Sequence, residues 1–279
     1  MKGADITKLL LSLVVVWIHT GTNSLYGIAE WVVPIFFFFS GYFLFAKIEK
    51  SGVGSTSADI VFSWIRKTVS LYLTWTVIYL PFAIYGFYLD GLTPMKAFVI
   101  WVRNVVFVGE NFMSWPLWYL LGMIQAGCII WFFEKINAPF AFLCLFAMLL
   151  YIAPKFIPFE QMKWYVTLFR TTRNGFFIGM PFMVLGGVGV RTNLLAFNAW
   201  KSGTVQHKIA MQLRFLSIHI YLTHMLWAEV LILSLHFSRG LALWTVVSLI
   251  SMMTGLCLLP FEKVKRTLYG RPFSLSARS

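Results

Sequence analysis

A lysine and a histidine on the first apolar segment, Lys8 and His19, stand eleven positions apart. Eleven residues make close to three helical turns, so in a helix the two side chains project from the same side, roughly 16 Å apart. An imidazole can act as a general base near neutral pH, and a lysine ammonium can hold a phosphate or a carboxylate. The pair therefore predicts a site for a donor with an anionic head and a long arm. Coenzyme A thioesters have that shape.

Other ionisable groups also fall within apolar segments, where lipid makes a charge costly and each such group is a functional candidate. The clearest are His224 and Glu229, which share a later segment. A structural role is the alternative for all of these residues. Lys8 can be a snorkelling anchor at the membrane surface and His19 a hydrogen-bonded interfacial histidine. His224 and Glu229 can serve hydrogen bonds between helices. Both interpretations stay open at this point.

The amino-acid composition indicates whether these groups lie in water or in a lipid bilayer. The chain has 279 residues, of which 59% are hydrophobic and 12% charged, and its mean hydropathy is +0.77. Soluble domains carry about 25% charged residues, so this composition excludes a soluble domain. We expect an all-α, polytopic transmembrane bundle in one domain over residues 1–279. The three cysteines lie in apolar runs, and no metal site is predicted.

Apolar segments separated by charged or Gly/Pro-rich breaks predict about eight membrane spans. The predicted spans are residues 6–20, 31–46, 69–88, 117–133, 139–153, 175–190, 215–235 and 241–260. Two weaker stretches, residues 95–108 and 162–170, mix aromatic and basic residues and are expected to be interfacial or re-entrant helices. The connection from Arg191 to Arg214 is polar and is predicted to hold no span.

The basic residues indicate the orientation of these spans. The net charge is +13, but the cations are spread over the loops rather than gathered on one element, so no nucleic-acid partner is expected. With both termini in the cytoplasm, sixteen of the 23 Lys and Arg residues face inward and seven face outward. This asymmetry satisfies the positive-inside rule. It predicts a multi-pass protein of the inner (cytoplasmic) membrane, with the lipid bilayer as a partner.

Several short segments, taken in order, carry a family resemblance. They are KLLLSLVVVWIH (8–19), VPIFFFFSGY (33–42), WIRK (64–67), LWYL (117–120), RNG (173–175) with GMPF (179–182) and Gly186, and SIHIYLTH (217–224). Together the chain resembles the membrane-bound acyltransferase family 3, which includes bacterial O-acetyltransferases that modify surface glycans.

The resemblance implies transfer of an acyl group, usually acetyl, from acetyl-CoA as co-substrate to a hydroxyl of a cell-surface or lipid-linked glycan such as O-antigen or exopolysaccharide. In that scheme His19 is the catalytic base or acyl carrier. The resemblance places CoA phosphates at the cations of the inner face, Lys8, Arg66 and Lys67. It implies a substrate-binding set of Arg173, Trp118 and His224.

Two features depart from that family. It usually has an arginine where this chain has Lys8, and it usually has ten spans, two of which would fall between Arg191 and Arg214. An inactive, shortened family member is therefore one alternative. Another, from a different class, is a transporter or flippase of a small polar or lipid-linked substrate, in which His19, His224 and Glu229 form a proton relay.

Overall fold

The computed structural model describes residues 2–21, 26–51, 56–192 and 204–269. The described residues form helices joined by loops and contain no strand, which confirms the all-α prediction for this part of the chain. The α-helices are α1 (Lys2–Thr20), α2 (Tyr26–Glu49), α3 (Ser57–Leu89), α4 (Pro94–Arg103), α5 (Leu117–Lys135), α6 (Phe140–Phe156), α7 (Lys163–Phe169), α8 (Met180–Arg191), α9 (Thr204–Leu235) and α10 (Leu241–Tyr269). Shorter turns are η2 (Asn104–Val108), η3 (Phe159–Gln161) and η4 (Gly175–Gly179).

Five of the described helices are long and apolar enough to cross a bilayer, so the chain is a multi-pass membrane protein. They are Trp31–Glu49, Ser57–Leu89, Leu117–Lys135, Gln212–Leu235 and Leu241–Leu259. Phe140–Phe156 and Gly175–Arg191 are apolar but shorter. All eight predicted spans coincide with helices, and among the described residues these five meet the length of about 20 apolar residues that a crossing needs.

Helix α1, 19 residues long, coincides with the first predicted span, residues 6–20. The polar connection predicted between Arg191 and Arg214 is partly helical, because α9 begins at Thr204. Residues 193–203 of that connection lie outside the described residues.

The chain forms two compact units, which we describe separately. Unit 1 comprises residues 1–22 and 200–279 and contains α1, α9 and α10. Unit 2 comprises residues 23–199 and contains α2 to α8. The prediction of a single domain over residues 1–279 is not tested by this division.

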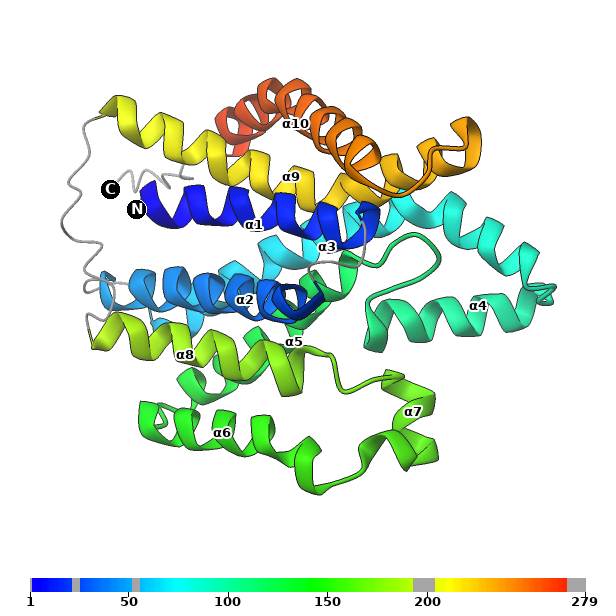
Figure 1. The fold of residues 1–279 in the computed structure, drawn as a ribbon. Helices are drawn as coiled ribbons and strands as arrows, with labels where there is room; N and C mark the ends of the chain where they lie inside the picture. The colour runs from blue at the N-terminus through cyan, green and yellow to red at the C-terminus, as the bar shows by residue number, and fades with distance from the viewer. Residues whose placement is uncertain (1, 22–25, 52–55, 193–203, 270–279) are drawn as a thin grey trace, which may run out of the picture. The chain divides into compact units, whose positions relative to one another are not determined.

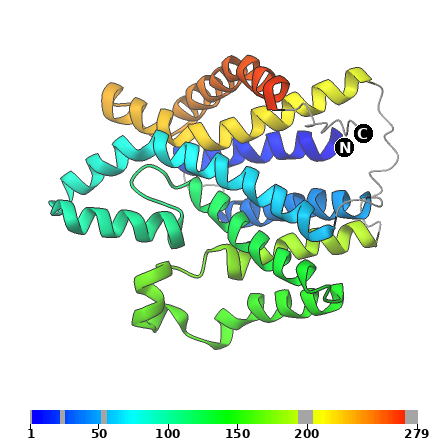
Figure 2. The ribbon, with the colours of Figure 1, turned by 180° about the vertical axis from the view of Figure 1, so that it is seen from behind.

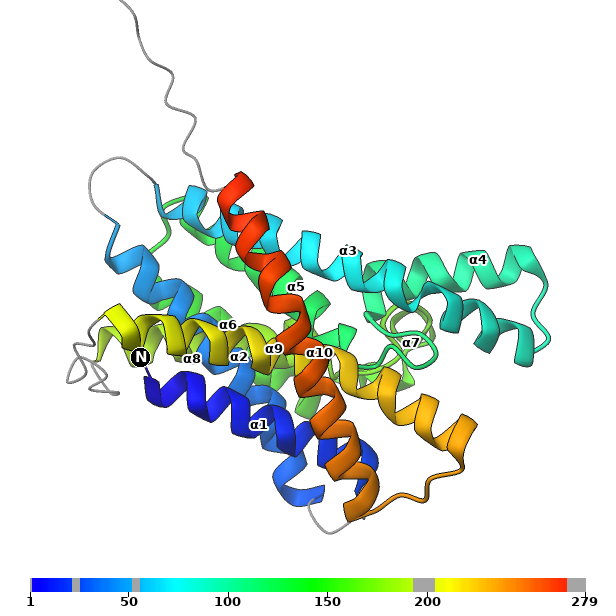
Figure 3. The same ribbon diagram turned by 90° about the horizontal axis from the view of Figure 1, so that it is seen from above.

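In unit 1, α1 runs beside α9 in the same direction (Figures 1 and 2), and α10 crosses α9 at an angle (Figure 3). Its buried apolar core includes Val16 on α1, Ile220 and Leu231 on α9, and Leu243 and Val247 on α10. Two hydrogen bonds join α1 to the start of α10. The Trp244 indole donates to the Leu13 carbonyl at 3.0 Å, and the Gly240 amide donates to the Thr20 carbonyl at 2.8 Å.

In unit 2, α2 packs against α8 at glycines that allow close approach of the two backbones. A Cβ atom on Gly186 would lie 2.2 Å from the carbonyl oxygen of Phe38, and one on Gly41 would lie 2.0 Å from that of Met183. Small residues at such crossings are typical of membrane helices, because packing rather than hydrophobic exclusion drives their association. The sequence therefore needs glycine at these positions to form the α2–α8 contact.

We predict that Gly186→Ala destabilises the protein, because its added methyl meets backbone atoms that cannot rotate away. Overpacking of this kind costs about 1–3 kcal/mol. The matched control is Gly189→Ala on the same helix, whose added Cβ would lie 3.3 Å from the Phe38 ring, a side chain that can shift. Thermal unfolding in detergent should show a lower midpoint for Gly186→Ala than for Gly189→Ala. Equal midpoints would contradict the close α2–α8 contact.

Candidate functional site

The residues singled out from the sequence divide between the two units. Lys8, His19 and His224 lie in unit 1. Arg66, Lys67, Trp118 and Arg173 lie in unit 2. Within each unit the structure brings some of them together, and we describe the units in turn.

In unit 1, His19 on α1 and His224 on α9 are in ring contact. Their ring centroids are 5.2 Å apart and the ring planes are inclined by 31°. His224 is fully buried, with an exposed fraction of 0%. The two helices therefore place both histidines that the sequence indicated at one point of the bundle.

The hydrogen bonds of His224 indicate its tautomer. Its Nδ1 atom lies 2.7 Å from the carbonyl oxygen of Tyr221 and 3.3 Å from that of Ile220. A carbonyl oxygen only accepts, so Nδ1 carries the proton, and in the neutral ring Nε2 holds a lone pair. This buried Nε2 has no hydrogen-bond partner among the described residues. In this tautomer the Nε2 atom can accept a proton or a hydrogen bond.

Three further buried polar atoms of unit 1 have no hydrogen-bond partner among the described residues. They are the indole nitrogen of Trp17 and the hydroxyls of Ser248 and Ser251 on α10. Buried polar groups are almost always paired, since an unpaired one costs about 1–3 kcal/mol. The interior of unit 1 therefore contains hydrogen-bonding groups that no described residue of the chain pairs with.

Near the N-terminus of α1, Asp5 and Arg214 form a two-point ion pair. Arg214 Nε donates to Asp5 Oδ1 at 2.9 Å and Nη2 donates to Oδ2 at 3.3 Å. Asp5 is 0% exposed, whereas the Arg214 side chain is 42% exposed. Lys8 lies close enough to this pair to be affected by both charges. Lys8 is therefore part of a charged group that joins α1 to α9. Its predicted role in binding the donor stays a prediction.

In unit 2, Arg66 and Lys67 are exposed neighbours on α3. Trp118 and Arg173 come together, with the guanidinium carbon of Arg173 6.0 Å from the Trp118 ring centroid. That distance is at the limit of a cation–π contact. The predicted substrate-binding pair of unit 2 is therefore a spatial pair, although the two residues lie far apart in the sequence.

Two charged residues join that pair. Arg170 Nη1 lies 3.9 Å from Glu110 Oε1, and the Glu110 carboxylate also experiences the charge of Arg173. Arg170 follows the last residue of α7 and has a positive φ of 60°. Residues other than glycine adopt this conformation only where surrounding contacts stabilise it. We refer to Glu110, Trp118, Arg170 and Arg173 as the arginine–glutamate cluster.

Hydrogen bonds between loops hold this cluster in place. Asn174 accepts at its side-chain oxygen from the amides of Phe176 and Phe177, and its amide nitrogen donates to the Tyr165 hydroxyl at 2.7 Å. Gln125 on α5 accepts from the Gly175 amide at 3.0 Å and donates to the Phe107 carbonyl at 3.2 Å. Rigid neighbours of this kind position a binding site.

A third arginine, Arg103, lies in the same region but is already occupied. Its Nε and Nη2 donate to the Asn104 side chain at 3.0 and 2.6 Å, and its Nη1 donates to the Thr167 carbonyl at 3.2 Å. Burial and the charge of Arg170 lower the pKa of Arg103. Arg103 therefore links η2 to α7 and supports the cluster from outside it.

Burial raises the pKa of the Glu110 carboxyl, and the nearby charges of Arg170 and Arg173 oppose that rise. Burial likewise raises the pKa of Tyr165 to about 12, so its hydroxyl stays protonated at neutral pH. Among the described residues, no group of histidine, cysteine and carboxylate side chains is arranged to hold a metal ion.

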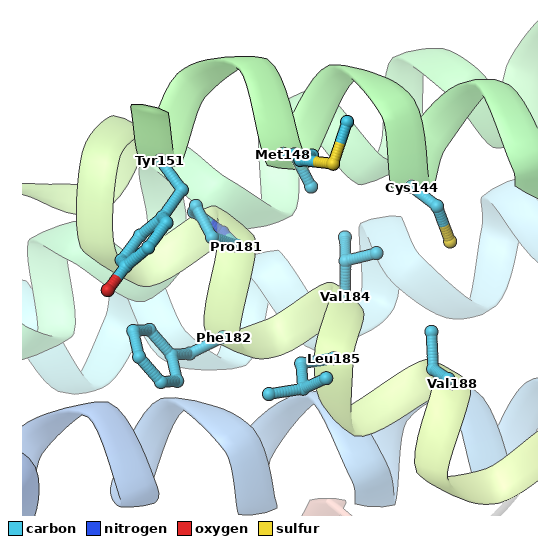
Figure 4. A pocket seen from close by; sticks show the side chains of 9 residues that line it. Cys144, Met148, Tyr151, Pro181, Phe182, Val184, Leu185 and Val188 are labelled. Carbon is cyan, nitrogen blue, oxygen red and sulfur yellow. The ribbon is translucent and has the colours of Figure 1, made fainter. Parts of the chain in front are cut away.

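An apolar groove of about 360 Å³ lies between α6 and α8. Figure 4 shows its lining, from Cys144, Met148 and Tyr151 on α6 to Phe182, Leu185 and Val188 on α8. It contains no ionisable pair that could carry out a reaction. We therefore do not assign chemistry to it.

Sequence reasoning missed part of this arrangement. Glu110, Arg170 and the Asp5–Arg214 pair were not among the candidates, although all are charged residues in or beside apolar segments. The available signal was the scarcity of acidic residues, ten in 279, which makes each carboxylate near a span worth attention. Glu229, which the sequence did indicate, is half-buried in α9, where the charge of Arg239 affects it.

Comparison with known proteins gives two relatives, both of them racemase enzymes. The chain is similar to an amino-acid racemase of Enterococcus faecalis, with 29% identity over 211 residues that cover 67% of this chain and 27% of the relative. It is also similar to a serine/alanine racemase of Enterococcus gallinarum, with 28% identity over 142 residues that cover 46% of this chain and 19% of the relative. The chain thus spans about a quarter or less of these relatives' lengths. No family model and no solved structure matches it.

These similarities correct the family and the function expected from the sequence. Both relatives are named as racemases, so the resemblance to acyltransferase family 3 is wrong, and so is the predicted acyl-CoA-dependent O-acyl transfer to a surface glycan. Neither relative's name supports the alternative of a transporter or flippase, or that of a shortened acyltransferase. The site assignments to Lys8, His19, Arg66, Lys67, Trp118, Arg173 and His224, and acetyl-CoA as co-substrate, are not tested by the comparisons and stay predictions.

We predict an asymmetry between the two halves of the Asp5–Arg214 pair. Arg214→Met leaves a fully buried carboxylate without its main partner and should cost about 2 kcal/mol, below the roughly 3–5 kcal/mol of a wholly isolated buried charge because Lys8 stays nearby. Asp5→Asn leaves a half-exposed arginine that water can reach, so its cost should be smaller. Thermal unfolding in detergent compares the single variants with the double variant. An Asp5→Asn loss equal to or larger than that of Arg214→Met would contradict this asymmetry.

A second prediction concerns pH and Glu110. The folded protein holds the Glu110 proton more tightly than the unfolded chain, whose carboxyl has the ordinary pKa of 4.5. Stability contributed by this group is therefore greatest at low pH and declines as pH rises from 4.5 through the raised pKa. Glu110→Gln should reduce that decline in a series of unfolding midpoints against pH. An unchanged slope would show that Glu110 is not buried as described.

Proposed function

We propose that this chain is the membrane-embedded part of a racemase-type enzyme and that it binds a free amino acid of the size of serine or alanine. The observation that carries the proposal is the similarity to two racemases, one of which is named for serine and alanine. The matched region includes at least part of the helical, apolar chain described above. The proposed binding of the amino acid is therefore a property of a membrane helix bundle.

The geometry of the histidine pair limits what the bundle itself does. A two-base racemisation removes a proton from one face of the α-carbon and returns one to the other face, so its two acid–base groups stand on opposite sides of the substrate. The ring centroids of His19 and His224 are 5.2 Å apart, within the range of rings in direct contact. No substituted carbon fits between them. We therefore propose that this pair does not invert the amino acid as two opposed bases.

The number of spans and the orientation of the chain in the membrane are also part of this proposal. Eight helices coincide with the predicted spans, and with both termini in the cytoplasm sixteen of the 23 lysine and arginine residues face inward, which supports that orientation. In this orientation the arginine–glutamate cluster of unit 2 faces outside. The proposed location is the inner membrane.

The test is direct binding of amino acids to the purified chain in phosphatidylcholine nanodiscs. Radiolabelled L- and D-forms of serine and alanine should bind saturably, and phenylalanine should bind more weakly if the site is small. Chiral chromatography of the same samples should show no interconversion of the enantiomers by this chain alone.

Two results would overturn parts of the proposal. The absence of saturable binding of serine or alanine would remove the amino acid as ligand. Interconversion by the purified chain that is lost in His224→Phe would show that the histidine pair takes part in inversion after all.

A further inference from the structure

The arginine–glutamate cluster of unit 2 combines both signs of charge at an accessible place. Arg170 and Arg173 are exposed, and the Glu110 side chain is 30% exposed. The four members come from the segment after η2, the first turn of α5, the end of α7 and the segment before η4. Figures 1 and 2 show α4 and α7 at the same end of unit 2.

The ion pair in this cluster is open, whereas two other pairs of the chain are closed. Arg170 and Glu110 are 3.9 Å apart. Arg191–Glu49 and Arg214–Asp5 each measure 2.9 Å, the length of a charge-assisted hydrogen bond. No hydrogen bond to the Glu110 carboxylate is found among the described residues. Its acceptor capacity is therefore available to a ligand.

The charges of the cluster define the class of ligand. Two guanidinium groups can hold a carboxylate in a planar, two-point manner. Glu110 would repel a ligand that carried only negative charge, and the arginines would repel one that carried only positive charge. A molecule with a carboxylate and an ammonium on the same small framework satisfies both requirements. The indole face of Trp118 suits the ammonium and also orients Arg173.

We infer that the arginine–glutamate cluster is the binding site for the zwitterionic amino acid, with its carboxylate on Arg170 and Arg173 and its ammonium on Glu110. This assignment rests on the proposed function. It goes beyond that function by locating the ligand in unit 2 and by giving each charge a partner. Trp118 is a positioning residue that fixes the Arg173 guanidinium.

The experiment compares alanine with two analogues, each of which lacks one charge. L-Lactate keeps the carboxylate but has no ammonium, and L-alanine methyl ester keeps the ammonium but has no carboxylate. Both are tested as competitors of radiolabelled L-alanine on the full chain in phosphatidylcholine nanodiscs. The wild-type protein should prefer alanine to either analogue by about tenfold or more, because each analogue loses a charge-assisted contact.

The variants separate the two halves of the site. Arg173→Gln should weaken alanine and lactate alike, by about tenfold or more. Glu110→Gln should weaken alanine while leaving lactate unchanged or bound more tightly. Arg191→Gln is the matched control, since Arg191 pairs with Glu49 and lies 3.7 Å from the Phe140 ring centroid, yet stands outside the cluster. It should not alter the dissociation constant, and unfolding midpoints verify that each variant is folded.

The outcomes distinguish this site from the proposed function. If the wild-type chain binds alanine but Arg173→Gln and Glu110→Gln bind it equally well, the cluster is not the site and the proposed function stands. If lactate competes as well as alanine, the cluster is a general carboxylate site and the inference is wrong. If the wild-type chain binds no amino acid, the proposed function fails and this inference fails with it.

Discussion

The constraint on which the structure depends is that a buried polar group in a membrane bundle has no water to bind. Backbone groups meet this constraint by forming helices, and side chains must find partners on neighbouring helices. The fully buried Asp5 does so through two hydrogen bonds from Arg214. Because α1 and α9 run side by side, this contact near the start of α1 helps to set their register. His19, almost four turns further along α1, then meets His224.

The sequence could predict the helices but not this register. Hydropathy alone placed eight segments on helices, since apolar runs between polar breaks reflect burial in lipid. It could not predict that Asp5 is a buried partner of Arg214, because that role depends on a residue of another helix. Nor could spacing on one helix predict the contact of His19 with His224. That contact depends on the relative position of two helices about 200 residues apart in the sequence.

The family expectation failed for a related physical reason. The motifs on which it depended consist largely of Phe, Leu, Val and Gly, residues that lipid exposure and close helix packing select in many membrane proteins. Such residues determine a fold, and a fold does not determine a reaction. Glu110 and Arg170 show the converse. In the sequence they are isolated charges between apolar segments and indicate only topology, whereas in the fold the segment after η2 and the end of α7 bring them together.

The two polar centres differ in a way that bears on function. In unit 1 the Asp5–Arg214 pair is closed at hydrogen-bond length, and the rings of the histidine pair, almost four turns further along α1, are in contact, although His224 Nε2 has no hydrogen-bond partner among the described residues. In unit 2 the guanidinium and carboxylate groups stand apart at 3.9 Å and border the surface. A group whose contacts are complete gains little from a ligand, whereas an incompletely paired charge on a rigid support gains a full charge-assisted hydrogen bond. Of the two ion pairs, the open one in the arginine–glutamate cluster therefore suits the proposed recognition of a small charged molecule, and the closed Asp5–Arg214 pair contributes to holding unit 1 together.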